Sequence, residues 1–218
     1  MDEILQKYIF DELGIDSVRF INGQNVSAVS SDIDIYCVTD DTRTSSVHIF
    51  QHGDEWVEIF IDNWSDMVNK ITNADEICVG FIKDMDNILG ESYLLSAKEL
   101  IPNEFRLPKR RLNLIYYRVK VLYSKYVAVK SPQAKNYFKG LILQQFFMLA
   151  FHYSGVWPKS PKKWYDQIEN INNEFVKDVI NCQDDDRIFS NICNQESAKF
   201  KGISMSKQSD DNQITFLG

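Results

Sequence analysis

The stretch GQNVSAVSSDID, residues 23–34, ends in two acidic residues that decide how the first half of the chain is interpreted. Asp32 and Asp34 lie two residues apart on a strand predicted over 30–38, where β-branched and aromatic residues alternate with others. Successive strand side chains point to opposite faces, so both carboxylates project to one side, and the isoleucines between them face a core. Two carboxylates on one face repel each other, and a hard cation such as Mg²⁺ removes that cost.

A third acid stands on a later predicted strand, EWVEIFID, over 55–62. Alternation puts Glu58 and Asp62 on one face of this strand. The branched aliphatic residues Val57, Ile59 and Ile61 lie on the other face. If this strand lies beside 30–38, Glu58 joins the two aspartates. Asp62, at the strand end, is interpreted as a capping or strand-end acid rather than a metal ligand. Three convergent carboxylates suit a pair of metal ions that stabilise the attacking and leaving oxygens of a phosphoryl transfer.

The remaining elements indicate a mixed front half and a helical back half. Val, Ile and aromatic runs predict strands, helical apolar spacing predicts helices, and residues 76–82 fit either. In the front half we expect a helix over 3–13, a strand over 17–21, a turn over 21–25, a strand over 46–51, a helix capped by Asn63 or Ser65 and running to 72, and a turn over 84–87. In the back half we expect helices around 112–122, 134–154, 164–179 and 184–196.

The predicted fold class is therefore α+β, with a mixed β-sheet core and flanking helices followed by a helical bundle. We place the two domains at residues 1–100 and 101–218, with the join within 88–108. The helix over 134–154 is apolar nearly all round, which favours burial among other helices. Burial within one chain and dimerisation both explain such a helix, so monomer and homodimer stay open.

At these residues the chain resembles the nucleotidyltransferase superfamily of DNA polymerase β. The family pattern is a strand, a Gly-Ser turn, a D-x-D strand and a third carboxylate on a following strand. The matching segments here are RFINGQ, SSDIDIY and WVEIFI. The back half, LILQQFFMLAFHYSGVWPKSPKKW, is similar to the helical substrate domain of small antibiotic-type nucleotidyltransferases. The resemblance covers most of residues 15–170.

The resemblance implies a set of site residues and cofactors. Asp32, Asp34 and Glu58 would hold two Mg²⁺ ions, and ATP or another NTP would be the donor. Gly23 and Gln24 stand where the family has Gly-Ser, so Ser27, Ser30 or Ser31 is left to supply the phosphate-binding hydroxyl; our choice is Ser31. Lys139, in the helical half, is the candidate for contact with the triphosphate, as an alternative to a solvated helix face.

Composition excludes several function classes. The 218 residues carry 24 Lys+Arg and 31 Asp+Glu, a net charge of −7, so a global basic coat for nucleic acid is not expected. KRR at 109–111 could form a local RNA-facing patch, but we interpret it as a solvated helix start. The sequence has no apolar run long enough to cross a membrane, and its acidic start is unlike a secretory signal. Four scattered cysteines and three histidines argue against a zinc cluster and fit a reducing cytoplasm.

Three functional hypotheses follow. The leading one is transfer of an NMP, AMP being favoured, from an NTP to a hydroxyl of a small acceptor such as an aminoglycoside-like antibiotic. The alternative acceptors are a tRNA 3′ end or a protein hydroxyl, as in nucleotidyltransferase toxins of toxin–antitoxin systems. The competing class is a nucleotide-binding or partner-binding module with little activity, which the replacement of Gly-Ser by Gly23-Gln24 favours and the intact D-x-D opposes.

Overall fold

A computed structural model describes residues 17–23, 32–40, 45–159, 161–205 and 214–216. The chain divides into two compact units between Asn103 and Glu104, close to the expected division between residues 100 and 101. The helix expected over 3–13 lies outside the described residues.

The described part of the first unit contains one mixed sheet of five strands in the order β3-β4-β2-β1-β5. Strands β2 and β4 are parallel, and every other neighbouring pair is antiparallel. This architecture, with its flanking helices, confirms the predicted α+β class. The strands are β1 (Val18–Gly23), β2 (Asp32–Thr39), β3 (Ser46–His52), β4 (Glu55–Asn63) and β5 (Asp86–Leu89).

One face of the sheet forms an aliphatic core. Alternate residues of three strands point to this face, so the predicted alternation along both acidic strands holds. Their side chains are almost completely buried, and they fix the register because a slip of one residue would turn them to the other face. The members of this cluster are Ile21, Ile33, Ile35, Cys37, Val57, Ile59 and Ile61.

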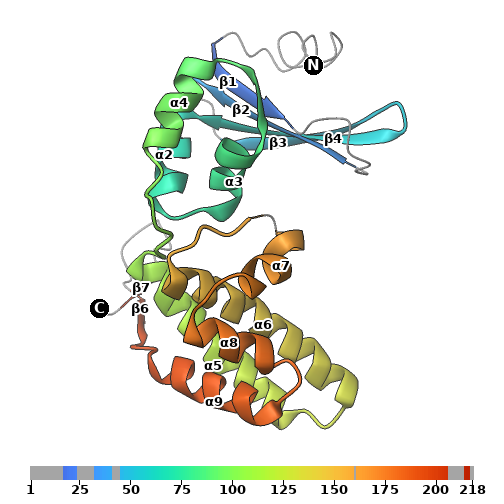
Figure 1. The fold of residues 1–218 in the computed structure, drawn as a ribbon, viewed down its shortest axis with the longest axis vertical. Coiled ribbons are helices and arrows are strands. Elements are labelled where there is room, and N and C mark those ends of the chain that lie inside the picture. The colour runs from blue at the N-terminus through green and yellow to red at the C-terminus, as the bar shows by residue number, and fades with distance from the viewer. Residues whose placement is uncertain (1–16, 24–31, 41–44, 160, 206–213, 217–218) are drawn as a thin grey trace. The chain divides into compact units, whose positions relative to one another are not determined.

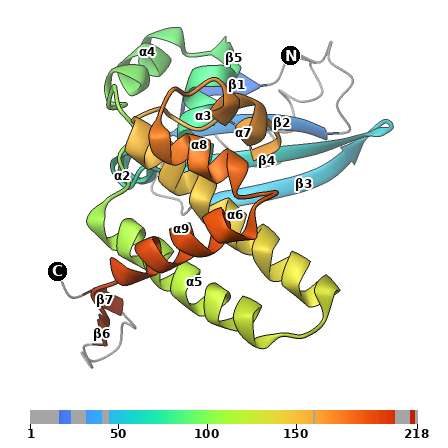
Figure 2. The same ribbon diagram turned by 60° about the horizontal axis from the view of Figure 1, so that its bottom comes forward.

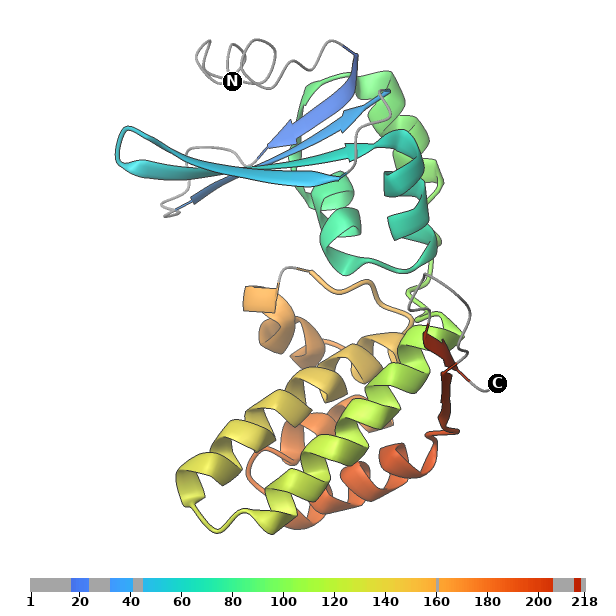
Figure 3. The same cartoon turned by 180° about the vertical axis from the view of Figure 1, so that it is seen from behind.

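Two helices, α2 (Trp64–Thr72) and α3 (Glu76–Asp84), lie against the opposite face (Figures 1 and 3). The Phe81 ring of α3 packs on the rings of Tyr36 and Phe60, with centroids 5.2 and 4.8 Å away. Asn63 caps α2 by accepting from the Asp66 N–H at 2.8 Å, as one of the two expected caps. The segment 76–82, which was ambiguous, is helical because its buried apolar side chains follow helical spacing.

A third helix of this unit, α4 (Glu91–Glu99), begins after a glycine that no other residue could replace without strain. Gly90 has φ +78°, and a Cβ there would stand 1.9 Å from the carbonyl oxygen of Arg19. The close approach lets β5 pair with β1 and then turn at once into α4.

The second unit consists mainly of helices. Its two long helices, α5 and α6, lie side by side (Figure 2), and Phe146, Phe151 and Phe189 are completely buried in the unit. Ser131 and Pro132 begin α6, and Gly155 ends it at φ +77°. The elements are α5 (Lys109–Ala128), α6 (Pro132–Ser154), a 3₁₀ turn (Pro161–Lys163), α7 (Trp164–Glu169), α8 (Glu174–Asn181), α9 (Asp186–Ala198) and the antiparallel pair β6 (Ile203–Met205) and β7 (Ile214–Phe216).

Three sequence-based expectations are wrong. The turn over 21–25 is strand as far as Gly23, and the turn over 84–87 is half strand, because both segments pair with each other along β1 and β5. The helix over 164–179 is two helices, since Asn173 caps α8 by accepting from the Val176 N–H at 3.3 Å. In each case a local preference gave way to a partner that is distant in sequence or to a cap.

Among the described residues, none of the helices combines the length and hydrophobicity that crossing a membrane requires.

Candidate functional site

The parallel pairing of β2 and β4 brings two of the three predicted acids together. Asp34 is the register partner of Glu58, and Asp32 is the partner of Trp56. Neighbouring strands lie about 4.8 Å apart and paired side chains share a face, so Asp34 and Glu58 project side by side. Both residues are half-buried. Asp32 is the first residue of β2, and its side chain lies outside the described atoms.

The end of β1 lies beside this acidic pair. Gly23 is the register partner of Ile35, and a Cβ on Gly23 would stand 3.8 Å from the backbone oxygen of Asp34. Because β1 and β2 are antiparallel, the chain leaves β1 at the edge where the D-x-D strand begins. Gln24 and Ser31, the other two predicted phosphate contacts, lie outside the described residues.

Exposed apolar side chains flank the acids on the hairpin side. Ile49 of β3 is the register partner of Glu58, so Ile49, Glu58 and Asp34 form a row across three strands. Ile49 is 59% exposed and Trp56 is 53% exposed. The acids are therefore reachable from an open sheet face. His48 of β3 pairs with Ile59 and so lies on the other side of the sheet.

Aromatic rings close the inner side of the acidic pair. The next register pair along the two strands is Tyr36 and Phe60, and both rings contact Phe81. The buried amide of Asn22 donates to the Phe81 carbonyl at 3.0 Å and accepts from Asn87 at 3.2 Å. These contacts hold the end of α3 against the sheet, so the acids stand at the boundary between a packed layer and an open face.

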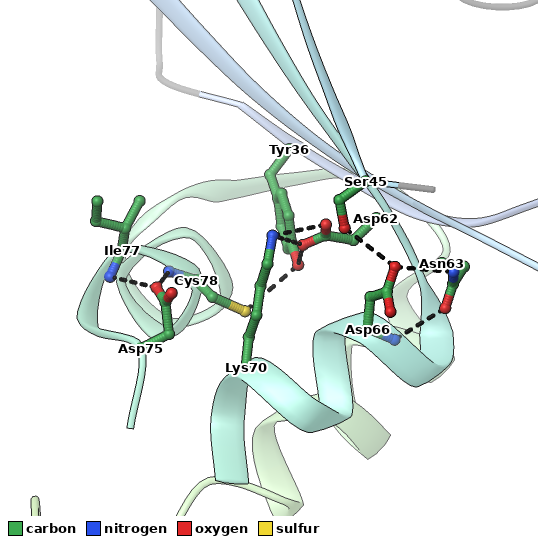
Figure 4. A network of polar contacts seen from close by, with 9 residues as sticks. All are labelled: Tyr36, Ser45, Asp62, Asn63, Asp66, Lys70, Asp75, Ile77 and Cys78. Atoms are coloured by element: carbon green, nitrogen blue, oxygen red, sulfur yellow. Dashed lines mark hydrogen bonds and ion pairs between the residues drawn. The ribbon is translucent and has the colours of Figure 1, made fainter. Parts of the chain in front are cut away.

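Beyond the rings lies a buried polar network that the sequence interpretation did not find (Figure 4). Asp62 is buried; it accepts from the Tyr36 hydroxyl at 2.8 Å and from the Lys70 ammonium at 2.7 and 2.8 Å. Asp62 is thus neither a helix cap nor part of the Asp34–Glu58 pair. A lysine of α2 could have been recognised only with knowledge of which sheet face that helix covers.

Burial and neighbouring groups in this network suppress ionisation of two side chains. Burial raises the pKa of the Cys78 thiol to about 12, although the hydrogen bond with Tyr36 opposes the shift. Burial, with the charges of Cys78 and Asp62 adding to it, raises the pKa of the Tyr36 hydroxyl well above its usual value. Tyr36 therefore stays protonated and can donate to Asp62, which suits a structural role for the network.

Lys139, the candidate for contact with the triphosphate, makes its contacts within the helical unit. Its ammonium donates to the Gln183 carbonyl and to the Asp186 carboxylate, both at 2.9 Å, and lies 5.2 Å from the Phe189 ring centroid. Its side chain is 18% exposed. These bonds join α6 to α9 and the turn before it, which explains Lys139 as a residue that holds the helical unit together.

The described side chains include no group of three or more His, Cys, Asp or Glu that could hold a metal ion. The pair Asp34 and Glu58 could supply two carboxylate ligands to a metal ion, and Asp32 is the position from which a third would come. Hard carboxylate oxygens are the donors that Mg²⁺ prefers, so these residue types fit that ion.

No protein-family model and no curated protein matches this chain. Among solved structures, the chain is similar to a nucleotidyltransferase-like protein from Exiguobacterium sibiricum, with 12% identity. The likeness covers 89% of this chain and 76% of that chain, with a TM-score of 0.48. A likeness of this extent says nothing about activity, so the function has to be argued from the residues of the site.

Proposed function

We propose that this protein is a Mg²⁺-dependent nucleotidyltransferase that moves an NMP, AMP being favoured, from an NTP to an acceptor hydroxyl. The observation that carries the proposal is the register pairing of Asp34 with Glu58, on the strand that begins at Asp32. Two carboxylates that share one strand face can contribute to the same cation site, and hard carboxylate oxygens are the donors that Mg²⁺ prefers. The fold supports the proposal by bringing the end of β1 to the same edge.

Asp32 and Asp34 are the residues that would hold Mg²⁺, and Glu58 would complete the ligands on the acceptor side. When bound, Mg²⁺ supplies charge neutralisation for the triphosphate and for the leaving pyrophosphate. The cation fits because every proposed ligand is a carboxylate.

The chain's own contribution is orientation and proton transfer. The β2–β4 pair fixes two carboxylates on one face, and the rings of Phe60 and Phe81 pack on the same face next to them. Glu58 is the proposed base that accepts the proton of the attacking hydroxyl, while the α-phosphorus–oxygen bond to pyrophosphate breaks. Catalysis of this kind depends mainly on position, which a sheet provides better than a loop.

The proposed acceptor is a small hydroxylated molecule of the aminoglycoside-like class, with an RNA 3′ end or a protein hydroxyl as the alternative. Salt dependence of acceptor binding separates these alternatives. Nucleic-acid affinity falls steeply with salt because bound counterions are released.

Pyrophosphate release from ATP and Mg²⁺, measured with panels of small polyols, aminoglycosides and RNA, tests the proposal. Asp32→Asn is expected to abolish release, and Asp54→Asn, in the β3–β4 turn, is the matched control that should keep it. Wild-type turnover by Asp32→Asn would contradict the assignment. ATP binding without release across every acceptor would favour the nucleotide-binding module instead.

A further inference from the structure

The net charge of −7 is the sum of a strongly negative first unit and a positive second unit. The unit Met1–Asn103 carries 6 Lys+Arg and 20 Asp+Glu, a net −14, whereas Glu104–Gly218 carries 18 and 11, a net +7. A charge separation of this size within one chain is typical of a protein whose basic part meets an anionic partner.

The positive charge is concentrated further within the helical unit. From Arg106 to Tyr165 the sequence contains 13 Lys+Arg and no Asp or Glu. This segment comprises α5, α6 and the proline-rich connection that follows them. Solvated helix faces usually mix both signs, because acids and bases four residues apart stabilise a helix. Because this segment of 60 residues contains no acids, its helices lack the stabilisation that such acid–base pairs provide.

The basic side chains of α5 gather on its exposed face. Arg110, Arg118 and Lys125 are exposed, and the 100° turn per residue places them within about 80° of one another around the helix. The opposite face is apolar and packed, with Ile115 and Val119 buried. From Arg110 to Lys125 the line of charge extends about 22 Å, at 1.5 Å per residue.

Aromatic residues accompany the charges. Tyr117 precedes Arg118 on the same face and is 38% exposed, although its ring also contacts that of Phe200, with centroids 5.3 Å apart. An exposed aromatic ring beside cationic side chains is the combination that binds single-stranded nucleic acid, where bases stack on rings while phosphates meet the cations.

We propose that the exposed face of α5, defined by Arg110, Tyr117, Arg118 and Lys125, binds single-stranded RNA. The length of the charged line suits a chain of phosphates better than one triphosphate. A membrane surface is disfavoured, since interfacial helices insert an apolar face and that of α5 is buried. This binding surface is independent of the reaction proposed for Asp34 and Glu58.

Fluorescence anisotropy of the full chain with a labelled 20-nucleotide RNA of mixed sequence, at several salt concentrations, tests the proposal. The double variant Arg118→Gln/Lys125→Gln should bind at least about tenfold more weakly at low salt, and the slope of log affinity against log salt should fall by about 1.4, at about 0.7 per phosphate contact. Tyr117→Ala should weaken binding at least about fivefold by removing a stacking partner.

Lys83→Gln/Lys98→Gln is the matched control, because it removes the same charge from exposed helix positions of the acidic unit. If both double variants lost RNA affinity to the same extent, the proposal would be overturned, since only the total charge of the protein would then matter. No RNA binding by the wild type at low salt would overturn it, as would tighter binding to anionic lipid vesicles than to RNA. Thermal unfolding of each variant shows whether weaker binding reflects lost folding.

Discussion

Asp34 of β2 is the register partner of Glu58 of β4, and the two side chains share one face of a parallel strand pair. Backbone hydrogen bonds between parallel strands are evenly spaced and fix the register. The proximity of Asp34 and Glu58 is therefore a property of the sheet rather than of a loop. The apolar residues on the opposite face of both strands are buried and hold that register. The core therefore positions the acids by holding the register of the two strands.

Removal of Lys70 should destabilise the first unit. Its ammonium bonds to both oxygens of Asp62, whose side chain is 2% exposed. Lys70→Met leaves that carboxylate buried without its cation, and we expect a loss of about 3 kcal/mol in the free energy of unfolding, measured by urea denaturation. Lys83→Met, at an exposed position, should change it by less than about 0.5 kcal/mol. Equal effects would show that the buried ion pair is not stabilising.

Two glycines should respond to alanine with opposite signs. A Cβ on Gly90 would clash with the Arg19 carbonyl at a positive φ, so Gly90→Ala should cost about 3 kcal/mol or more. Gly140 is within α6 and a Cβ there meets nothing within 4 Å, so Gly140→Ala should stabilise the helix by about 0.5–1 kcal/mol. Thermal unfolding of both variants checks this, and a destabilised Gly140→Ala would contradict the described environment.

The stability of the second unit should fall in acid because of His152. Burial lowers the pKa of its imidazole, and the charges of Arg106 and Lys199 lower it further. Its Nδ1 also accepts a hydrogen bond from the Leu107 N–H at 3.1 Å. Because the folded pKa lies below that of the unfolded chain, the unfolded chain binds more protons, and stability is lost as the pH falls through about 6.5 and below.

Urea denaturation at pH 7, 6 and 5 checks this prediction. The wild type should lose more stability between pH 7 and 5 than His152→Asn, in which an amide oxygen takes the place of the accepting nitrogen. Parallel losses in the two proteins would assign the acid sensitivity to other groups.

The cysteines should be inert in the native protein. All four are buried, and burial raises the pKa values of Cys78 and Cys182 to about 12. At pH 8 these two thiols are almost entirely protonated, and the thiolate is the reactive form. Ellman's reagent should therefore detect no thiol within minutes in native protein and all four in urea. A thiol that titrates quickly in native protein would contradict this burial.

Much of the first unit could be predicted because its strands alternate. The positions of Ile33, Ile35 and Val57 on one face, and of Asp34 and Glu58 on the other, follow from period two once the strands are neighbours. Sequence could not show that β5 pairs with β1, since Asp86 and Asn87 are typical turn residues and the pairing is a tertiary contact.

The candidate site was less completely predictable. Local pattern identified the acids, but it gave no sign of the bonds between Lys139 and Asp186 or between Lys70 and Asp62. Such ion pairs depend on how helices pack, and a lysine in sequence looks the same whether it meets a phosphate or a neighbouring carboxylate. The net charge of the whole chain also gave no sign of the basic helical unit, because the opposite charges of the two units partly cancel.

The most direct test of the central claim is calorimetric titration of ATP with Mg²⁺ into wild type, Glu58→Gln and Glu55→Gln, because it needs no acceptor. Glu55 and Glu58 lie on the same strand but point to opposite faces. We predict binding by the wild type, at least about tenfold weaker binding by Glu58→Gln, and unchanged binding by Glu55→Gln. Equal affinities for all three proteins, or no Mg²⁺-dependent binding by the wild type, would contradict the assignment of this carboxylate face.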